Sequence, residues 1–311
     1  GRSMSVSAER QLGYGIIVPL ITPLNTDGSI DTSGLRRLLD HVIKGGVDAV
    51  FVMGSSGEFP RFSREEWVRA VGAAVKHTAG RVPVYAGVSE ARWQEVALRL
   101  EMGFDLGIDA AVLSPMYYFP PNQDEICRFY EKVGAKSPGP LFLYSIPPYT
   151  QVRIEPPSVR KIGNVIPLAG IKDSGDDLEI FRSYLEVAKE LEGFKVAIGN
   201  EGMLEEAFKL GASGAVPSLA NVFPRLLADV FRASRKADWG EVSSLCTKIE
   251  RINYLNGIVD SSMNVVAWKK YALSLLGICG ATMTHPSVSY DGETLERIKG
   301  HLTENGLALP L

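Results

Sequence analysis

Lys172 stands directly behind the apolar run LAGI and directly in front of the polar, turn-forming residues DSGDD. A lysine at the end of a buried strand is held away from bulk water, and desolvation favours the neutral amine, which is the nucleophile. Such an amine can attack a carbonyl and form a Schiff base. A lysine that only snorkels at a strand end gives the same local pattern. The residues expected near Lys172 must therefore distinguish a Schiff-base lysine from an ordinary one.

Two further groups of residues could complete a Schiff-base site. Tyr144, in LYSIPPYT, ends another apolar run, and its phenol could shuttle protons beside the amine. Ser55 and Ser56, in GSSGE, offer hydroxyls and backbone amides that could hold a carboxylate. Each group alone is also typical of ordinary structure, because a buried tyrosine often packs in a core and glycine with serine often makes a turn.

The elements that must position these residues follow from the pattern of short apolar runs. Eight runs rich in β-branched residues are each followed by a longer segment of helical period. The runs span residues 15–24, 48–55, 82–88, 110–115, 140–147, 168–173, 195–200 and 213–218. Strict alternation through eight units predicts an α/β fold, a parallel (β/α)8 TIM barrel, rather than a doubly wound sheet with an early glycine-rich phosphate turn. In such barrels the active site lies at the carboxyl ends of the strands, where Lys172, Tyr144 and Ser55 fall.

After about residue 222 the pattern is helical only. We expect a barrel over residues 14–235 and a C-terminal helical extension over residues 236–311. Residues 1–13 are interpreted as a tag remnant, with GRSM preceding an original start at Met4, and an N-terminal arm.

Composition narrows the classes of function. A net charge of -3 over 311 residues gives no electrostatic case for binding nucleic acid or an anionic membrane, and no apolar run approaches the roughly 18 residues of a spanning helix. The three cysteines are far apart, which suits a reducing cytoplasm. Without clustered metal-ligand residues, we expect no metal.

Several motifs together resemble the dihydrodipicolinate synthase and N-acetylneuraminate lyase superfamily. They are TP (22–23), GSSGE (54–58), PMYYF (115–119), YSIP (144–147) and GIKDSGD (170–176), in order over nearly the whole chain. The resemblance implies a barrel enzyme without metal or organic cofactor that forms a Schiff base with pyruvate or another 2-oxo acid. It also implies a homotetramer, built as a dimer of dimers.

The resemblance assigns roles to individual residues. It makes Lys172 the Schiff-base lysine and Tyr144 the proton-shuttling tyrosine. Ser55 and Ser56 match the pair that binds the substrate carboxylate, and Tyr118 matches the tyrosine of the synthase proton relay.

The departures from the family patterns concern the second substrate. Synthases carry an arginine in a YNVPxRT pattern, where this chain has Tyr149, and a phenol cannot replace a bidentate guanidinium. We therefore expect Tyr149 to pack against an uncharged or hydroxylated aldehyde, while a carboxylated acceptor would need another cation, for which Arg153 is the candidate. The acidic pair of sialic acid lyases is only half kept, with Glu201 present and Gly202 in the second position.

The residues expected to bind distal hydroxyls are Ser174, Glu201 and Ser218. The main functional prediction is a class I aldolase that cleaves a 4-hydroxy-2-oxo acid to pyruvate and an aldehyde, most similar to 4-hydroxy-2-oxoglutarate or 2-keto-3-deoxy sugar acid aldolases. The alternatives are a 4-hydroxy-tetrahydrodipicolinate synthase and a 2-keto-3-deoxy acid dehydratase of the same superfamily. A non-catalytic barrel that binds 2-oxo acids is the alternative from another class.

Overall fold

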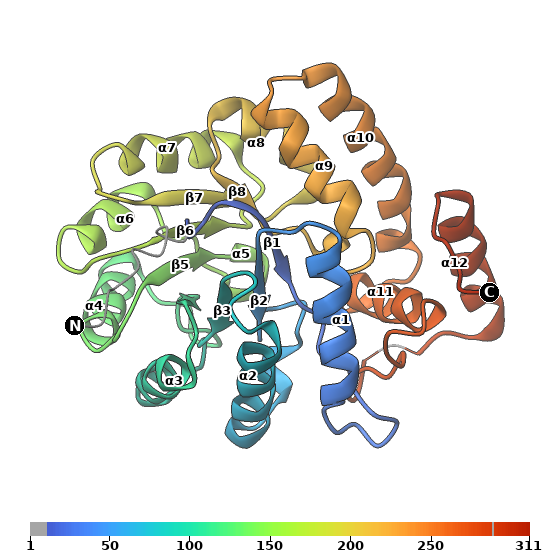
Figure 1. Cartoon of the computed structure of the whole chain (residues 1–311). Coiled ribbons are helices and arrows are strands. Elements are labelled where there is room, and N and C mark those ends of the chain that lie inside the picture. The colour runs from blue at the N-terminus through green and yellow to red at the C-terminus, as the bar shows by residue number, and fades with distance from the viewer. Residues whose placement is uncertain (1–10, 288) are drawn as a thin grey trace, which may run out of the picture.

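Eight parallel strands close into a barrel in chain order, with β8 paired to β1 (Figure 1). The computed structural model describes residues 11–287 and 289–311, so most of the predicted N-terminal segment, residues 1–10, lies outside the described residues. The strands are β1 (Gly15–Pro19), β2 (Ala49–Val52), β3 (Val84–Gly87), β4 (Ala110–Leu113), β5 (Leu141–Ser145), β6 (Gly170–Asp173), β7 (Lys195–Ile198) and β8 (Gly214–Ala215). Each lies inside one of the predicted apolar runs, which confirms the predicted (β/α)8 barrel.

Helices surround the barrel, and several begin at residues that cap them. Ser63 and Glu66 form a reciprocal capping box at the start of α2, and Asn122 and Glu125 form another at the start of α4. The helices are α1 (Thr32–Lys44), α2 (Arg64–Thr78), α3 (Trp93–Leu106), α4 (Gln123–Gly134), α5 (Pro147–Thr150), α6 (Pro156–Gly163), α7 (Leu178–Ala188), α8 (Leu204–Leu210), α9 (Pro224–Arg235), α10 (Trp239–Ile252), α11 (Asn264–Leu275) and α12 (Gly292–Glu304). Short 3-10 helices are η1 (Phe59–Arg61), η2 (Glu201–Met203), η3 (Ser218–Asn221) and η4 (Asn253–Gly257).

Two hydrophobic cores hold the barrel together. A larger core packs the outer faces of the strands against the helices, and a smaller one fills the barrel itself. Within the barrel, the rings of Tyr85 and Phe142 stack at 5.4 Å, and Phe51 packs in the same cluster. Burying each such side chain stabilises the fold by about 1.5–3 kcal/mol. The filled interior leaves the carboxyl ends of the strands as the place for a site.

The helices after α9 extend the chain beyond the eight barrel units. In Figure 1, α10 runs beside α9, and α12 carries the C-terminus at the edge of the molecule. The helix α11 packs on η3 and η4 and contacts α12. Residues just before and after α11 reach back to the barrel mouth, which matters for the site described below.

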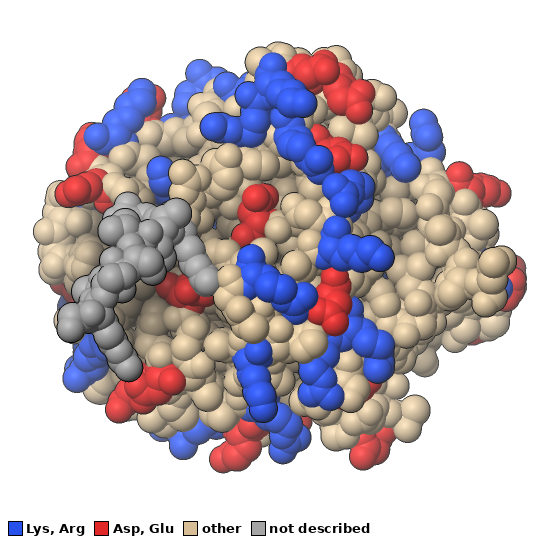
Figure 2. All heavy atoms as spheres, in the orientation of Figure 1, with Lys and Arg blue, Asp and Glu red and all other residues tan. Residues whose placement is uncertain are grey.

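The surface in the view of Figure 2 carries basic and acidic side chains interspersed. Among the residues that the structure describes, none of the helices has the length and hydropathy needed to cross a membrane.

Candidate active site

Lys172 and Tyr144 are neighbours at the carboxyl end of the barrel. The parallel pairing of β5 with β6 sets Tyr144 opposite Lys172, and both side chains lie on the inner face of the barrel. The side-chain nitrogen of Lys172 lies 4.2 Å from the centre of the Tyr144 ring and 5.4 Å from that of Phe51. Lys172 is 8% exposed and Tyr144 is 3% exposed. The structure thus brings the predicted nucleophile and the predicted proton shuttle together in a nearly dry position.

Ser55 is the third member of this group. Its Oγ lies 3.2 Å from the Tyr144 hydroxyl, within hydrogen-bond distance. The loop that carries it is fixed by the segment that follows β1, because the hydroxyl of Thr22 donates to the carbonyl of Gly57 at 2.9 Å. Ser56 follows in the same loop and is half-buried. Of the two predicted carboxylate-binding serines, Ser55 therefore lies next to the predicted proton shuttle.

A cavity of about 300 Å³ opens beside Ser55 and Tyr144, and we call it the mouth cavity. Its walls come from the loops after β2, β4 and β5 and from Ser262 and Met263, which precede α11. Several of its polar side chains are already bonded within the protein. The hydroxyl of Ser114 donates to Pro115, and that of Thr150 donates to the carbonyl of Ile146. These two hydroxyls are therefore not free to donate to a ligand in the mouth cavity.

Glu58 forms a buried ion pair that the sequence did not reveal. Its carboxylate accepts a hydrogen bond from the Lys270 ammonium at 2.7 Å, and both side chains are 0% exposed. The other carboxylate oxygen accepts from the backbone N–H and the hydroxyl of Thr284. Glu58 also has a left-handed backbone, with φ of 61°, which is uncommon for a residue other than glycine. Glu58 therefore ties the serine loop to α11 and to the segment that follows it.

Arg61 is a second residue that the sequence analysis missed. It ends η1, three residues after Glu58, and it lines the mouth cavity. Its Nη1 donates to the carbonyl and hydroxyl of Thr284 and to the hydroxyl of Ser287. All three acceptors are neutral, and Arg61 makes no ion pair within residues 11–287 and 289–311. The signal available in the sequence was its position just beyond GSSGE, in the loop after β2.

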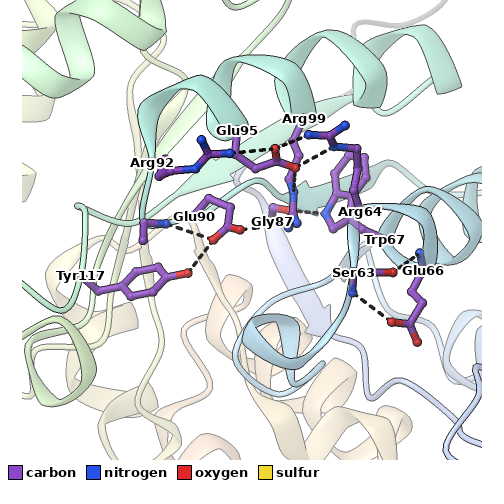
Figure 3. A network of polar contacts seen from close by, with 11 residues as sticks. Ser63, Arg64, Glu66, Trp67, Gly87, Glu90, Arg92, Glu95, Arg99 and Tyr117 are labelled. Carbon is purple, nitrogen blue, oxygen red and sulfur yellow. Dashed lines mark hydrogen bonds and ion pairs between the residues drawn. The ribbon is translucent and has the colours of Figure 1, made fainter.

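Tyr117, rather than Tyr118, lines the mouth cavity. Figure 3 shows that its hydroxyl donates to Glu90, at 2.9 Å, at one end of a polar network. The network continues through Arg99 to Glu95, which receives a bidentate pair from Arg64 at 3.0 and 2.6 Å. Burial and the bond to Glu90 raise the pKa of Tyr117. A phenol held in this way keeps its proton. Tyr117 therefore forms part of the cavity lining and is not a candidate for proton transfer.

Tyr118, predicted to belong to a proton relay, does not line the mouth cavity of its own chain. It is 81% exposed, and its ring contacts that of Phe119, which is equally exposed. Its backbone φ of 78° lies in the left-handed region. Within one chain, the structure does not bring Tyr118 to Lys172.

Tyr149, predicted to pack against the aldehyde, is part of the mouth cavity lining. Its side chain is half exposed, and burial of the remainder together with the nearby Tyr144 raises the pKa of its hydroxyl. Arg153, the predicted alternative cation, lies elsewhere, with Nη2 donating to the carbonyl of Gly175 behind β6.

Glu201 and Ser218 line a different cavity, of about 890 Å³, between the ends of β7 and β8 and the helices α10 and α11. The Glu201 carboxylate is fully engaged there: it accepts from the hydroxyl of Ser218, the N–H of Leu219 and the amide of Asn253. Ser174 packs against Gly199 at the end of β7, where a Cβ would lie 2.1 Å from its Oγ. The structure thus brings Glu201 and Ser218 together but places them outside the mouth cavity.

Asp173 lies behind Lys172, on the opposite face of β6. Its Oδ1 accepts from the N–H of Gly175, while its Oδ2 is buried without a partner in the described structure, as is the Nη1 of Arg153. Burial, opposed in part by Gly175 and Arg153, raises the pKa of Asp173 to about 6. Among the described residues, no group of three His, Cys, Asp or Glu side chains could hold a metal ion.

Comparisons with known proteins agree with this geometry. The sequence model of the Dihydrodipicolinate synthetase family matches residues 13–305. The 4-hydroxy-tetrahydrodipicolinate synthase of Leptothrix cholodnii is 30% identical over 94% of this chain and 98% of its own.

Solved structures of the same family also resemble this chain. Dihydrodipicolinate synthase from Bacteroides thetaiotaomicron superposes with a TM-score of 0.90 at 33% identity, over 94% of this chain and 99% of that one. YagE of Escherichia coli K12, a member of the dihydrodipicolinic acid synthase family solved in complex with pyruvate, has a TM-score of 0.90 at 27% identity and covers 96% of this chain and 100% of its own. The predicted resemblance is thereby confirmed, and the chain belongs to the dihydrodipicolinate synthetase family.

Proposed function

We propose that this enzyme joins the amine of Lys172 to C2 of pyruvate as a Schiff base and uses the adduct to make or break a carbon–carbon bond to an aldehyde. The observation that carries the proposal is the close arrangement of Lys172, Tyr144 and Ser55 at the barrel mouth. Family membership supports the choice of pyruvate, and so does the related YagE, which was solved with pyruvate.

The proposed chemistry begins with attack of the Lys172 amine on the pyruvate carbonyl. Loss of water from the carbinolamine leaves an iminium, which withdraws electrons from C3. Loss of a C3 proton gives an enamine, and the enamine carbon attacks the aldehyde. In the reverse direction Tyr144 takes the proton of the C4 hydroxyl as the C3–C4 bond breaks. Ser55 and Ser56 hold the carboxylate, which aligns the reacting bond with the iminium.

Of the finer activities, 4-hydroxy-tetrahydrodipicolinate synthase has the better support from the comparisons, because the curated relatives carry that name. The names therefore favour the synthase, an alternative in the sequence analysis, over the 4-hydroxy-2-oxo acid aldolase placed first there. One observation still favours the aldolase: Tyr149 stands where synthases carry their arginine.

The proposal is tested by pyruvate-dependent consumption of aldehydes, with aspartate semialdehyde and glyceraldehyde as acceptors. Lys172→Ala should abolish consumption, because it removes the amine that forms the Schiff base. Lys161→Ala, which alters an exposed lysine on α6, is the matched control and should keep it. Full activity in Lys172→Ala would refute the proposal, and identification of the products separates carbon–carbon chemistry from loss of water.

A further inference from the structure

A buried polar cluster lies on the outer face of the barrel, directly behind Lys172 and Tyr144. Asp173 follows Lys172, Ser145 follows Tyr144, and the two are paired with each other across β6 and β5. Because side chains alternate along a strand, both point to the outer face, where the barrel mainly packs apolar side chains against helices. Ser145 is 0% exposed and Asp173 is 1% exposed. Polar groups buried in this way destabilise a fold unless their contacts compensate, so the cluster requires an explanation.

Arg153 belongs to the same cluster and lies across Gly175 from Asp173. A Cβ on Gly175 would lie 2.3 Å from Nη1 of Arg153 and 3.0 Å from Oδ1 of Asp173. The N–H of Gly175 donates to Oδ1 of Asp173 at 2.9 Å, and its carbonyl accepts from Nη2 of Arg153 at 3.0 Å. The turn after β6 is therefore held between a carboxyl group and a guanidinium.

One atom of each of these two groups has no hydrogen bond. Oδ2 of Asp173 and Nη1 of Arg153 are both buried, and neither has a partner in the described part of the chain. An ionised carboxylate and a guanidinium form strong hydrogen bonds, either directly or through one water. The two free atoms, on groups that flank one glycine, are therefore complementary to each other.

The cluster also joins the loop after β5 to the turn after β6. The N–H of Ile154 donates to Oγ of Ser145 at 3.2 Å, and the hydroxyl of Tyr184 donates to the carbonyl of Ile154. The N–H of Ser174 donates to the carbonyl of Ser145 at 2.8 Å. Arg153 precedes Ile154, so its bond to the turn completes a link between the two segments that follow the reacting strands.

The charges around Asp173 decide when it can bind Arg153. The titratable and charged groups that face Asp173 come from the loop after β5, its own turn and α7, and they are Arg153, Asp176, Asp177 and Tyr184. Burial raises the pKa of Asp173 to about 6, although the charge of Arg153 acts in the opposite direction. Asp173 is therefore mostly protonated at about pH 4.5 and mostly ionised at about pH 7.5.

We infer that Asp173 and Arg153 are positioning residues: the ionised carboxylate binds the guanidinium across Gly175, and this contact fixes the ends of β5 and β6 that carry Tyr144 and Lys172. The inference rests on the proposed function, because it concerns the support of the same reacting pair. Neither Asp173 nor Arg153 lines the mouth cavity. Their effect on the reaction is therefore through geometry, to which rates of positioned groups are sensitive.

The test uses a reaction that needs pyruvate alone. The iminium of Lys172 with pyruvate loses a C3 proton to give the enamine, the enamine takes up a deuteron from D2O at C3, and hydrolysis returns deuterated pyruvate and the free amine. NMR measures the rate of this exchange with pyruvate saturating. Asp173→Asn should match the unmodified protein at about pH 4.5 and be slower by about 10- to 100-fold at about pH 7.5. The ratio of the two rates removes the effect of groups that titrate equally in both proteins.

Variants of Arg153 test whether the two residues act together. Arg153→Gln should slow exchange at about pH 7.5 as Asp173→Asn does, and Arg153→Lys, which keeps the charge, should recover part of the rate. The double variant Asp173→Asn with Arg153→Gln should be no slower than either single variant, because both changes remove one contact. Asp124→Asn makes the same substitution at an exposed aspartate on α4 and is the matched control, with no change expected.

Stability separates positioning from structural damage. From about pH 4.5 to about pH 7.5, the stability of Asp173→Asn relative to the unmodified protein should rise, because only the unmodified protein buries a carboxylate. Its relative exchange rate should fall over the same range. A rate ratio that does not depend on pH, a parallel fall of rate and stability, or additive losses in the double variant would overturn the inference. Absence of both exchange and a borohydride adduct in the unmodified protein would refute the proposed function, and the inference with it.

Discussion

At the scale of single residues, the proposed chemistry depends on three side chains from three strands or strand ends. Tyr144 lies between the other two, with its ring 4.2 Å from the Lys172 nitrogen and its hydroxyl 3.2 Å from Ser55. Within one chain, Tyr144 is therefore the tyrosine placed to transfer the substrate proton in the proposed mechanism. Tyr117 keeps its proton, and Tyr118 is exposed. In the proposed mechanism, the hydroxyl of Tyr144 is the part of the side chain that moves the proton.

Tyr144→Phe should therefore separate binding from turnover. The ring that packs on Lys172 remains, so the pyruvate adduct should still form. Turnover should fall by ~10² or more, the usual loss when a general acid or base is removed. Single-turnover trapping and steady-state rates measure the two effects. Unchanged turnover would transfer the proton-moving role to another group, with Tyr118 of a neighbouring subunit as the first to examine.

Asp173 gives a prediction for stability against pH. Its pKa in the folded protein, about 6, lies above the ordinary value of 3.8, so folding favours the protonated acid. The stability that this group contributes is complete below pH 3.8 and is lost as the pH rises through about 6. Asp173→Asn cannot ionise and keeps an oxygen that can accept from Gly175.

The free energy of unfolding of Asp173→Asn, relative to the unmodified protein, should therefore rise by roughly 1–3 kcal/mol between about pH 4.5 and about pH 7.5. Urea unfolding at the two pH values measures this difference. A difference that does not depend on pH would mean that Asp173 is ionised in the fold throughout this range.

At the scale of elements, the β2 loop is positioned by a part of the chain more than two hundred residues away. Lys270 on α11 and Glu58 in the loop are separated by 212 positions. Ser55 and Arg61 flank Glu58, so the pair fixes both the serine loop and η1. The C-terminal helices are therefore part of the active-site support.

Lys270→Met should destabilise the protein by about 3–5 kcal/mol, because it leaves the Glu58 carboxylate buried without its partner. The double variant Glu58→Gln with Lys270→Met carries no unpaired charge and should recover part of that loss. Chemical denaturation of the three proteins gives the comparison. If the double variant were no more stable than Lys270→Met, the unpaired charge would not be the cause.

The strands and several residues at their ends could be predicted from the sequence, whereas the long-range contacts that shape the mouth cavity could not. Alternation of short apolar runs with helical segments is a local signal, and it located all eight strands and the residues at their ends. The roles of Glu58 and Arg61 depend on Lys270 and Thr284, and such long-range contacts leave no periodic pattern. The position of Glu201 similarly depends on Asn253 in η4. The strand-end motif therefore predicted that Glu201 follows β7, but not which cavity its side chain lines.

At the scale of the whole molecule, the barrel and the family are established, and assembly is still a proposal. The resemblance in sequence implies a homotetramer, and the exposed aromatic pair Tyr118 and Phe119 is a surface that an assembly could cover. Light scattering of the purified protein should give the mass of four chains. The mass of a single chain at working concentrations would contradict this proposal.

The central claim is that Lys172 is the residue that binds pyruvate covalently. Treating the enzyme with pyruvate and borohydride, followed by digestion and mass spectrometry, tests it most directly, because reduction makes the Schiff base permanent. We predict one adduct per chain, on the peptide that contains Lys172. The absence of an adduct, or labelling of Lys161 or Lys195 instead, would contradict the account.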